Sequence, residues 1–589
     1  MKTSERWCII NAEMNNKRIG VLASALVGCI FTLSAQDLTM KITKRYLNLP
    51  VSHQVDRALM TFDVGGRQER VFEIRLASGK PDYWVFCDMS ALKNKEIKIS
   101  YTGNKTGINK IYQADEITGQ DSLYKETNRP QIHYTQRRGW NNDPNGLLYY
   151  DGEYHLFYQH NPYERDWGNM HWGHSISKDL MHWEHLPVAL TKDANGEIFS
   201  GSIVIDRDNT AGFGKDAMVA VYTSNGQKQT QSLAYSLDKG RTFIKYENNP
   251  VLKDDAKPDF RDPKVFWYAA GSKWIMSLAT GQTITFYSSS DLKEWKKLSD
   301  FGDGIGAHGG VWECPDLIQM DYNGQKKWVL LVSINPGGPN GGSATQYFVG
   351  DFDGVTFTAD NLPYPLWIDY GKDNYAGVTW NNVPDGRHLF IAWMSNWQYA
   401  GVVPSMTWRG GMTLPRELAL QKDADGRPII TSRIVKEVDA IAGEWKTISA
   451  SDNTYAIDNN EDAYELQINM DIADNENLTL TLSNEKGDKY PISLNRADKS
   501  FIIDRTQSGE VSFSSEFGKV LYSPLNLSSN AVSLTLFVDK SSVEALINDG
   551  MVQQTNLVYP SGIYNSLSVE SGKGQIIKSV KVRTLSSVW

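Results

Sequence analysis

The stretch SKDLMHW at 177–183 decides the fold, because its pattern of a polar turn followed by an aromatic residue returns three more times. SLDKGRTF ends at Phe243, SSDLKEW at Trp295 and GDFDGVTF at Phe357, at intervals of 60, 52 and 62 residues. The copies follow runs of β-forming residues, as expected of strands joined by turns. This period suits one four-stranded blade with long loops, and about five such blades fill the middle of the chain, which predicts a five-bladed β-propeller.

Two further β-rich regions flank the predicted propeller at 126–425. Residues 38–125 contain short β-like runs such as RVFEIRLA and EIKISYT, broken by Gly, Asp and Asn, and predict a small N-terminal β-domain. Residues 426–445 have helical or linker character. From 446 to 589 the strands alternate again and predict a β-sandwich. The expected fold class is therefore all-β: a five-bladed β-propeller followed by a C-terminal β-sandwich, with a small extra N-terminal β-domain.

Composition limits the function classes. The 589 residues are too many for one hydrophobic core, and 41% hydrophobic with 22% charged residues is ordinary for a globular protein. A formal net charge of −9 leaves no basic stripe, so neither nucleic acid nor an anionic membrane is an expected partner. The 18 Trp and 28 Tyr residues are enough to line a sugar-binding cleft, although most of them are expected in the core.

Residues 1–37 predict a targeting segment. Lys17 and Arg18 supply positive charge, an apolar run follows at 19–35, and the small Ala35 suits cleavage before residue 36. LVGC ending at Cys29 also resembles a lipobox, but the apolar residues after it favour ordinary cleavage. Either reading predicts export, to the periplasm or the medium, with membrane attachment only if Cys29 is lipidated.

Cysteines and histidines do not form a metal or disulfide pattern. Cys87 and Cys314 lie in different predicted domains, so no disulfide framework is expected. Six of the ten histidines fall between His155 and His185, which raises the alternative of a zinc site. That segment alternates like strands and contains no HExxH motif, so no metal is predicted.

Three acids stand in apolar or turn-rich settings in different predicted blades. They are Asp143 in WNNDPNG, Asp262 in DFRDPKVFWY and Glu313 in GGVWECPDLIQM. Each also has a purely structural interpretation. Asp143 could be an Asx-turn residue, Asp262 a partner of Arg261, and Glu313 an ordinary loop acid. The inner strands of a propeller converge on one axial channel, however, so acids near their starts can meet in one funnel. The conjunction of the three therefore favours a catalytic site.

The neighbours of two of these acids predict different roles. Glu313 lies beside Trp312 and Cys314, where poor hydration would raise its pKa and make it a general acid. Asp143 lies among amide donors, which favour the ionised form that a nucleophile needs.

The motifs around these acids closely resemble glycoside hydrolase family 32, the invertases, inulinases and levanases. They occur in order as WNNDPNG, FYQHNP, WGNMHWGH, FSGS, RDP, ECP, DYGKDNYA, IAWMSNWQY, WRGGMTLPREL and DKSSVEALINDG. The resemblance covers about 130–589. It implies a five-bladed propeller, in agreement with the repeat count, and it leaves the region before 125 unexplained.

The resemblance also implies site roles. Asp143 matches the nucleophile, Glu313 the acid/base, and Asp262 the acid that holds sugar hydroxyls and stabilises the transition state. The residues that match the pocket for terminal fructose are Asn142, Gln159, Trp167, Phe199, Ser200, Arg261, Tyr375 and Trp393. The chain departs from the family pattern at Asn141, expected beside the nucleophile, and at the pair Asn374-Tyr375.

The implied activity is retaining hydrolysis of β-fructans (levan, inulin or both), with fructo-oligosaccharides and sucrose as further substrates. Double displacement without a cofactor requires the Asp143 and Glu313 carboxyls to lie about 5–5.5 Å apart. Release of terminal fructose is expected. The alternatives are an endo-acting levanase or inulinase, a fructosyltransferase, and a fructan-binding protein without catalysis. The hairpin DKSSVEALINDG at 539–550 is expected to pack against the propeller rather than to bind sugar.

Overall fold

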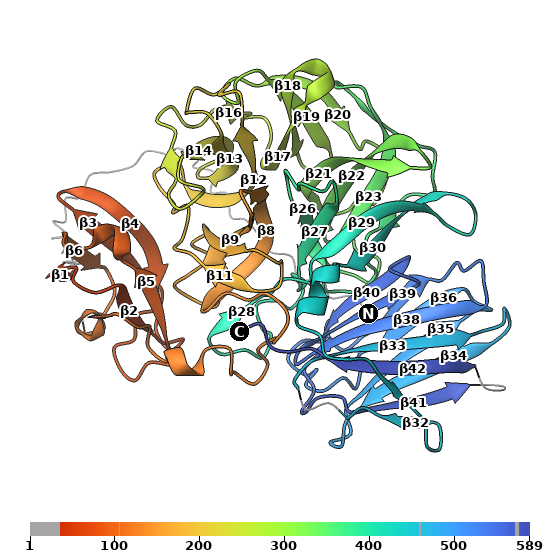
Figure 1. Ribbon diagram of the computed structural model, residues 1–589. Helices are drawn as coiled ribbons and strands as arrows, with labels where there is room; N and C mark the ends of the chain where they lie inside the picture. Colours follow the sequence, from red (N-terminus) through yellow and green to blue (C-terminus); the bar gives the residue numbers. More distant parts are fainter. Residues whose placement is uncertain (1–35, 105, 459–460, 572–575) are drawn as a thin grey trace, which may run out of the picture.

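A computed structural model describes residues 36–589 apart from 105, 459–460 and 572–575. The predicted targeting segment, with Cys29, therefore lies almost wholly outside the described residues. Figure 1 shows a small N-terminal β-domain beside a β-propeller, and a C-terminal β-sandwich at the other side of the propeller. No helix of the described residues is long and apolar enough to cross a membrane.

The propeller has five blades, and each begins with its innermost strand. These inner strands are β8 (Gly139–Tyr150), β12 (Glu197–Asp206), β17 (Arg261–Tyr268), β21 (Val311–Tyr322) and β26 (Tyr375–Thr379). They lie around the axis, and the predicted all-β propeller and sandwich fold is confirmed (Figure 1).

The outer strands complete each blade as antiparallel sheets. In the first two blades they are β9 (Glu153–Asn161), β10 (His171–Ser177), β11 (Trp183–His185), β13 (Ala217–Asn225), β14 (Gln229–Ser236), β15 (Ile244–Lys245) and β16 (Leu252–Lys253). In the third and fourth they are β18 (Lys273–Ala279), β19 (Ile284–Ser289), β20 (Lys296–Phe301), β22 (Gln325–Asn335), β23 (Ala344–Phe352), β24 (Phe357–Ala359) and β25 (Leu366–Trp367). In the fifth they are β27 (His388–Trp393), β29 (Arg416–Lys422) and β30 (Pro428–Ile434).

The sequence repeat marks the turn between the third and fourth strands of a blade. In the first blade the Asp179 carboxylate accepts hydrogen bonds from backbone N–H groups two and three residues further on. The Trp183 indole donates to the Leu180 carbonyl at 3.0 Å. Asp291 and Trp295 make the same contacts in the third blade. The period is visible in the sequence because this turn is held by its own residues.

Two short segments join distant parts of the propeller. The two-residue strand β28 (Trp408–Arg409) pairs in parallel with β8, so a segment of the fifth blade closes the ring onto the first. The segment 426–445 differs from the expected linker. Its first half forms β30, which pairs with β29 along its whole length, and the short helix η5 (Lys436–Ala440) follows. Pairing with a neighbouring strand thus overrides the local helical character.

The N-terminal domain consists of two small sheets. The first contains β1 (Gln36–Lys41), β6 (Glu96–Tyr101), β3 (Ala58–Val64) and β4 (Arg67–Ile74), and the second contains β5 (Tyr83–Asp88), β2 (Tyr46–Val51) and β7 (Tyr112–Ala114). Short helices η1 (Ser90–Leu92) and η2 (Ile108–Lys110) connect the two sheets, and η3 (Gln120–Ser122) follows β7 on the way to the propeller. Tyr163 of the propeller stacks on Phe72 with ring centroids 3.5 Å apart, so the core of this domain continues into the propeller.

The sandwich consists of two six-stranded sheets over one core. One sheet contains β31 (Lys446–Ile448), β42 (Ile577–Thr584), β33 (Tyr464–Asp471), β38 (Ala531–Asp539), β39 (Ser542–Ile547) and β40 (Val552–Leu557). The other contains β32 (Thr454–Ala456), β41 (Ser566–Ser571), β34 (Asn477–Ser483), β35 (Lys489–Asn495), β36 (Ser500–Asp504) and β37 (Val520–Pro524).

Buried charges join the sandwich to the propeller. His133 lies between Asp539 and Glu544, at 2.7 and 2.9 Å, and Arg416 bridges Glu544 and Asp369; all five side chains are fully buried. Burial alone would lower the pKa of His133, but hydrogen bonds to Asp539 and Glu544 raise it to about 9. Two acids of the hairpin at 539–550, Asp539 and Glu544, are thus paired with propeller side chains, which supports the packing interpretation.

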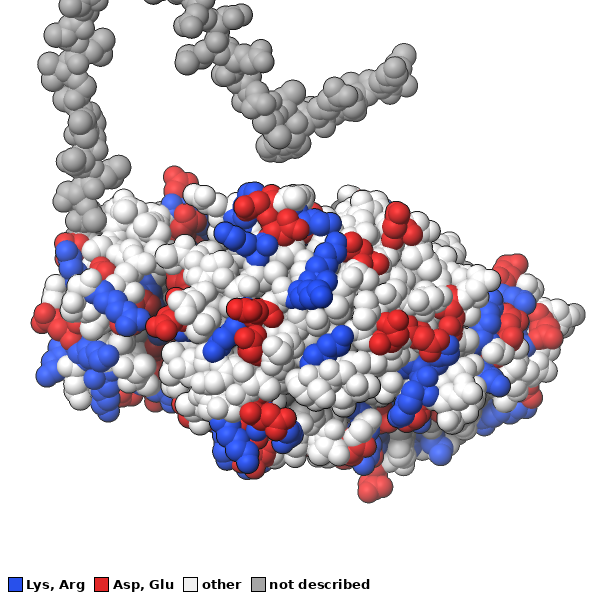
Figure 2. Space-filling model, turned by 90° about the horizontal axis from the view of Figure 1, so that it is seen from above, with Lys and Arg blue, Asp and Glu red and all other residues white. Residues whose placement is uncertain are grey.

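The outer surface carries both signs of charge. On the face seen from above in Figure 2, Lys and Arg side chains alternate with Asp and Glu, and large uncharged areas separate them. That face shows no extended basic area of the kind that binds a polyanion.

We predict that His133→Ala destabilises the protein by about 3–5 kcal/mol, because it leaves two buried carboxylates without their shared partner. The protonated His133 contributes its full stabilisation below its ordinary pKa near 6.5, and this contribution is lost as pH rises through about 9. Thermal unfolding between pH 6.5 and 9 measures both effects. His182→Ala removes an exposed histidine as the control. An unchanged melting temperature in His133→Ala would contradict this account.

Candidate active site

Each of the five inner strands contains a β-bulge near its start. In every case two residues of the inner strand oppose one residue of the second strand of the blade. The bulged pairs are Asn142–Asp143, Phe199–Ser200, Asp262–Pro263, Cys314–Pro315 and Ala376–Gly377. A bulge bends its strand and redirects its side chains. The three predicted acids lie in or directly before these bulges, which turn them towards one end of the axis.

Backbone strain accompanies three of the bulges. Asp262, Cys314 and Ala376 have φ values of 64°, 47° and 54°, in the left-handed region that non-glycine residues rarely adopt. In the second blade, a Cβ on Gly201 would lie 2.1 Å from the Val221 carbonyl oxygen, so only glycine fits after that bulge. Strain of this kind is typical of functional sites that the surrounding fold holds in place.

Asp143 is held by three donors. Its Oδ1 accepts from the Asn142 amide at 2.9 Å, and its Oδ2 accepts from the Ser200 hydroxyl at 2.9 Å and from the Cys314 thiol at 3.5 Å. The Trp140 indole donates to Asn142 Oδ1 at 2.7 Å, which points the amide nitrogen at Asp143. The carboxylate is therefore oriented before any substrate binds.

Burial raises the pKa of two of the acids. For Asp143 the pKa rises to about 6, because burial and the neighbouring charge of Glu313 outweigh its hydrogen-bond donors. The expected stabilisation by amides is present but smaller than the cost of burial. Burial also raises the pKa of Asp262 to about 7, with Arg261 opposing the shift and the other two acids adding to it. The backbone N–H of Cys314 donates to Asp262 Oδ2 at 3.0 Å.

Glu313 has polar partners rather than the predicted apolar ones. Arg261 donates to Oε1 through Nε at 3.0 Å and Nη2 at 2.9 Å, and the Tyr375 hydroxyl donates to Oε2. Trp312 is fully buried in the core, with its indole donating to the Ala307 carbonyl. Alternate side chains of a strand point to opposite faces, so Trp312 lies away from the Glu313 carboxyl.

These side chains line one pocket with a cavity volume of about 70 Å³. Its lining residues are Asn142, Asp143, Gln159, Trp167, Phe199, Ser200, Arg261, Asp262, Glu313 and Trp397. The structure thus brings together the three acids and six of the eight residues predicted to bind substrate. Of the other two, Tyr375 contacts Glu313, and Trp393 is fully buried with its ring centroid 4.9 Å from that of Trp397.

Sequence reasoning missed Trp397 and Cys314 as site residues. Trp393 is the last residue of β27, whereas Trp397 follows in the loop that faces the pocket. The motif IAWMSNWQY contains both tryptophans. The strand ends between them, and the position of that end decides which of the two faces the pocket. Cys314 contacts Asp143 and also Asp262, at 3.6 Å, and sequence placed it only as a neighbour of Glu313.

The departures from the family pattern lie outside the pocket lining. Asn141 is fully buried, and its carbonyl oxygen is so close to Gly410 that a Cβ there would lie 2.0 Å away. It does not line the pocket, although it was expected beside the nucleophile. Asn374 is also buried and donates to Asp369 at 3.4 Å.

The histidines and cysteines considered as metal ligands contact neighbouring side chains or lie buried. In the described part of the chain, no group of three or more His, Cys, Asp and Glu side chains is arranged to hold a metal ion. His155 and His174 contact each other at 3.0 Å, and His185 contacts the Tyr124 hydroxyl at 2.5 Å. Cys87 and Cys314 are both free and buried.

Comparison with known proteins gives consistent results. The model of the glycosyl hydrolases family 32 N-terminal domain matches residues 133–430, and that of the family 32 C-terminal domain matches 432–585. A levanase of Bacillus subtilis (strain 168) is 45% identical over 488 residues, covering 80% of this chain and 72% of the relative. An extracellular exo-inulinase of Aspergillus awamori is 38% identical over 523 residues, covering 79% and 96%.

Solved structures agree with these matches. The exo-inulinase of Aspergillus awamori superposes with a TM-score of 0.73 at 35% identity, covering 79% of this chain and all of that one. The β-fructofuranosidase of Schwanniomyces occidentalis, complexed with fructosyl-erythritol, gives 0.71 at 34% identity, covering 79% and 99%.

A propeller whose axial pocket collects carboxyl groups and aromatic rings, joined to a sandwich, defines a carbohydrate-cleaving enzyme. More particularly, the chain belongs to glycoside hydrolase family 32.

We predict that Asp143→Asn abolishes activity yet stabilises the fold at pH 7.5 by about 1–3 kcal/mol. The pKa of Asp143 is raised from 3.8 to about 6, so its ionisation costs stability above pH 6, and that cost disappears below about pH 4. Activity of the unaltered enzyme should fall as pH drops through about 6. Melting temperatures at pH 7.5 and 4 measure the difference, with Asp303→Asn as the exposed control. Equal gains at both pH values would contradict it.

Proposed function

We propose that this enzyme releases terminal fructose from β-fructans such as levan and inulin, with retention of configuration. The observation that carries this proposal is the meeting of Asp143, Asp262 and Glu313, from three different blades, in one small pocket. Relatives named levanase and exo-inulinase support the fructan substrate. Sucrose and fructo-oligosaccharides present the same terminal fructose and are proposed as further substrates.

The proposed mechanism uses two of the carboxyls for covalent and proton-transfer steps. Glu313 gives its proton to the glycosidic oxygen while Asp143 attacks the anomeric carbon, so the leaving sugar departs and a fructosyl-enzyme ester forms. Water then loses a proton to Glu313 and displaces Asp143. Arg261 and Tyr375 stabilise the Glu313 carboxylate between the two steps. Asp262, adjacent to both, is proposed to hold the fructose hydroxyls.

The size of the pocket supports an exo mode of action. The pocket is small, with a cavity volume of about 70 Å³, and three aromatic side chains, Trp167, Phe199 and Trp397, line it. Such a pocket takes the end of a fructan chain, whereas internal cleavage needs an open groove on both sides of the reacting bond.

Export is part of the proposal. The targeting pattern at 1–37 and the extracellular exo-inulinases among the relatives both support it. A polymer such as levan or inulin is then met outside the cytoplasm, where an exported hydrolase can degrade it. Attachment to a membrane is proposed only for the case in which Cys29 is lipidated.

Product analysis on levan, inulin and sucrose tests the proposal. Fructose as the sole early product of a fructan supports exo action, and proton NMR should show that the first-formed anomer retains the β configuration. Early oligosaccharides would instead establish endo cleavage, and lengthened chains a transferase. Binding without any turnover would reduce the protein to a fructan-binding module.

We predict that Glu313→Gln lowers kcat by a factor of about 10²–10⁴ while fructan binding changes much less. The reason is that the amide keeps the shape of the side chain but has no proton to give. Steady-state kinetics and calorimetric titration with a fructo-oligosaccharide measure the two quantities. Glu294→Gln, in an exposed turn, is the control. An unchanged kcat would exclude Glu313 as the acid/base.

A further inference from the structure

The loop between β9 and β10 carries the exposed ring of the pocket. Trp167 lines the pocket and yet is 44% exposed, so it lies at the mouth. Its ring centroid is 6.3 Å from that of Phe199 and 6.4 Å from that of Trp397, both in edge-on contact. Gly168 follows it with a φ of 132°, a backbone conformation that favours glycine. With only these two ring contacts, the position of Trp167 depends also on what holds its loop.

The N-terminal domain supplies that support through two arginines. Arg57 donates from Nε to Glu164 Oε2 at 2.8 Å and from Nη2 to the Trp167 carbonyl at 3.3 Å. Arg75 donates to Glu164 at 2.7 Å and to Asp166 at 2.9 Å. The Glu164 side chain is fully buried, so its charge depends on these partners.

Contacts at the two ends of the loop complete the attachment. Tyr163, before Glu164, stacks on Phe72 of β4. Asn169, after Trp167, accepts from the backbone N–H of Glu73 at 2.9 Å and donates to its carbonyl at 2.8 Å. The whole loop from 163 to 169 is thus bound to one strand of the N-terminal domain and the residues around it.

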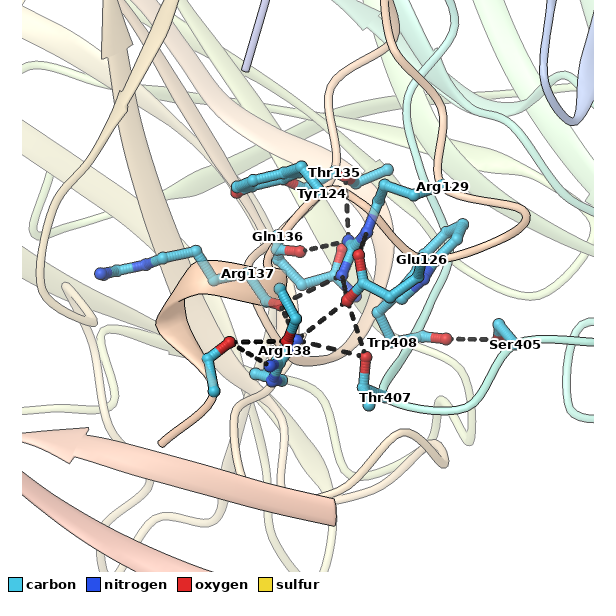
Figure 3. Close-up of polar contacts among 12 residues, drawn as sticks. Tyr124, Glu126, Arg129, Thr135, Gln136, Arg137, Arg138, Ser405, Thr407 and Trp408 are labelled. Carbon is cyan, nitrogen blue, oxygen red and sulfur yellow. Dashed lines mark hydrogen bonds and ion pairs between the residues drawn. The ribbon is translucent and has the colours of Figure 1, made fainter. Parts of the chain in front are cut away.

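A second brace reaches the same loop from the segment that joins the N-terminal domain to the propeller. Figure 3 shows Glu126 of this segment bonded to Arg129, Arg138 and Thr407. Thr407 belongs to the segment 401–409, which ends in β28 and contacts the Trp167 loop. In these contacts Arg165 donates to the Ser405 carbonyl and Arg409 pairs with Asp166.

We infer that the N-terminal domain contributes to the fructan site: Arg57 positions Trp167 at the pocket mouth and so sets the affinity with which the pocket holds the fructan. The inference rests on the proposed function. Residues 36–132 precede both family matches, so this support is additional to the matched domains. Arg57 is a positioning residue, since its contact is with the Trp167 backbone and the proton-transfer groups lie deeper in the pocket.

Arg57→Ala tests the inference. It removes the bond to Trp167 but leaves Arg75 to neutralise Glu164, so the fold is retained. On whichever of levan or inulin the unaltered enzyme hydrolyses, KM should rise about tenfold, because substrate binding must then order Trp167 without this charge-assisted hydrogen bond, while kcat changes less than about twofold. Arg57→Lys should give a KM between that of the unaltered enzyme and that of Arg57→Ala. Lost folded protein would instead lower kcat and leave KM unchanged.

A double-mutant cycle with Trp167→Ala separates positioning from a direct contact. If Arg57 acts through the ring, Arg57→Ala should add nothing to KM in the Trp167→Ala background. The matched control is Arg67→Ala on β4 of the same domain, an 84% exposed arginine remote from the loop contacts, which should leave KM unchanged. Additive effects, or an unchanged KM in Arg57→Ala, would overturn the inference. Absence of fructan hydrolysis by the unaltered enzyme would instead refute the proposed function.

Discussion

Closure of five sheets around one axis is the constraint on which the rest of the structure depends. It places the starts of five inner strands side by side, and β28 pairs with β8 to complete the ring. Because every inner strand carries a bulge at the same level, the side chains there leave the ordinary alternation and face one funnel. Asp143, Asp262 and Glu313 lie far apart in the chain, and only this closure brings them together.

Buried charges are balanced by partners of opposite charge at the domain interface but not in the active-site pocket. At the interface, His133 and Arg416 match Asp539, Glu544 and Asp369, so burial is offset by partners of opposite charge. In the pocket, three carboxyls share one principal cation, Arg261, and burial raises the pKa of two of them. The surrounding propeller supplies the stability that such a site lacks. The first arrangement secures the fold, and the second keeps acids reactive near neutral pH.

The N-terminal domain changes how the pocket is understood. Sequence left this region without a function, and the matched family domains begin after it. In the structure it contacts the loop of Trp167 from one side, while the segment around Glu126 braces the neighbouring segment 401–409 from another. The mouth of the pocket is therefore assembled from parts of the chain that flank the family 32 domains as well as from the domains themselves.

The sequence by itself determined the blade count and singled out the three acids of the pocket, because both depend on local chemistry. The turn around Asp179 and its copies is held by hydrogen bonds within a few residues, so its period can be read directly. The acids stand in short motifs, WNNDPNG, RDP and ECP, that can be recognised without the fold. Strand β30 was read as linker, because its pairing with β29 is set by the sheet and not by its own residues.

Tertiary structure alone decided which side chains face the pocket. Trp397 rather than Trp393 lines it, Trp312 points into the core, and Asn141 lies behind the wall. Each outcome depends on where a strand ends or bulges, and a shift of one residue reverses the direction of a side chain. The link from Arg57 to Trp167 spans 110 residues and two domains, and no local pattern encodes such a contact.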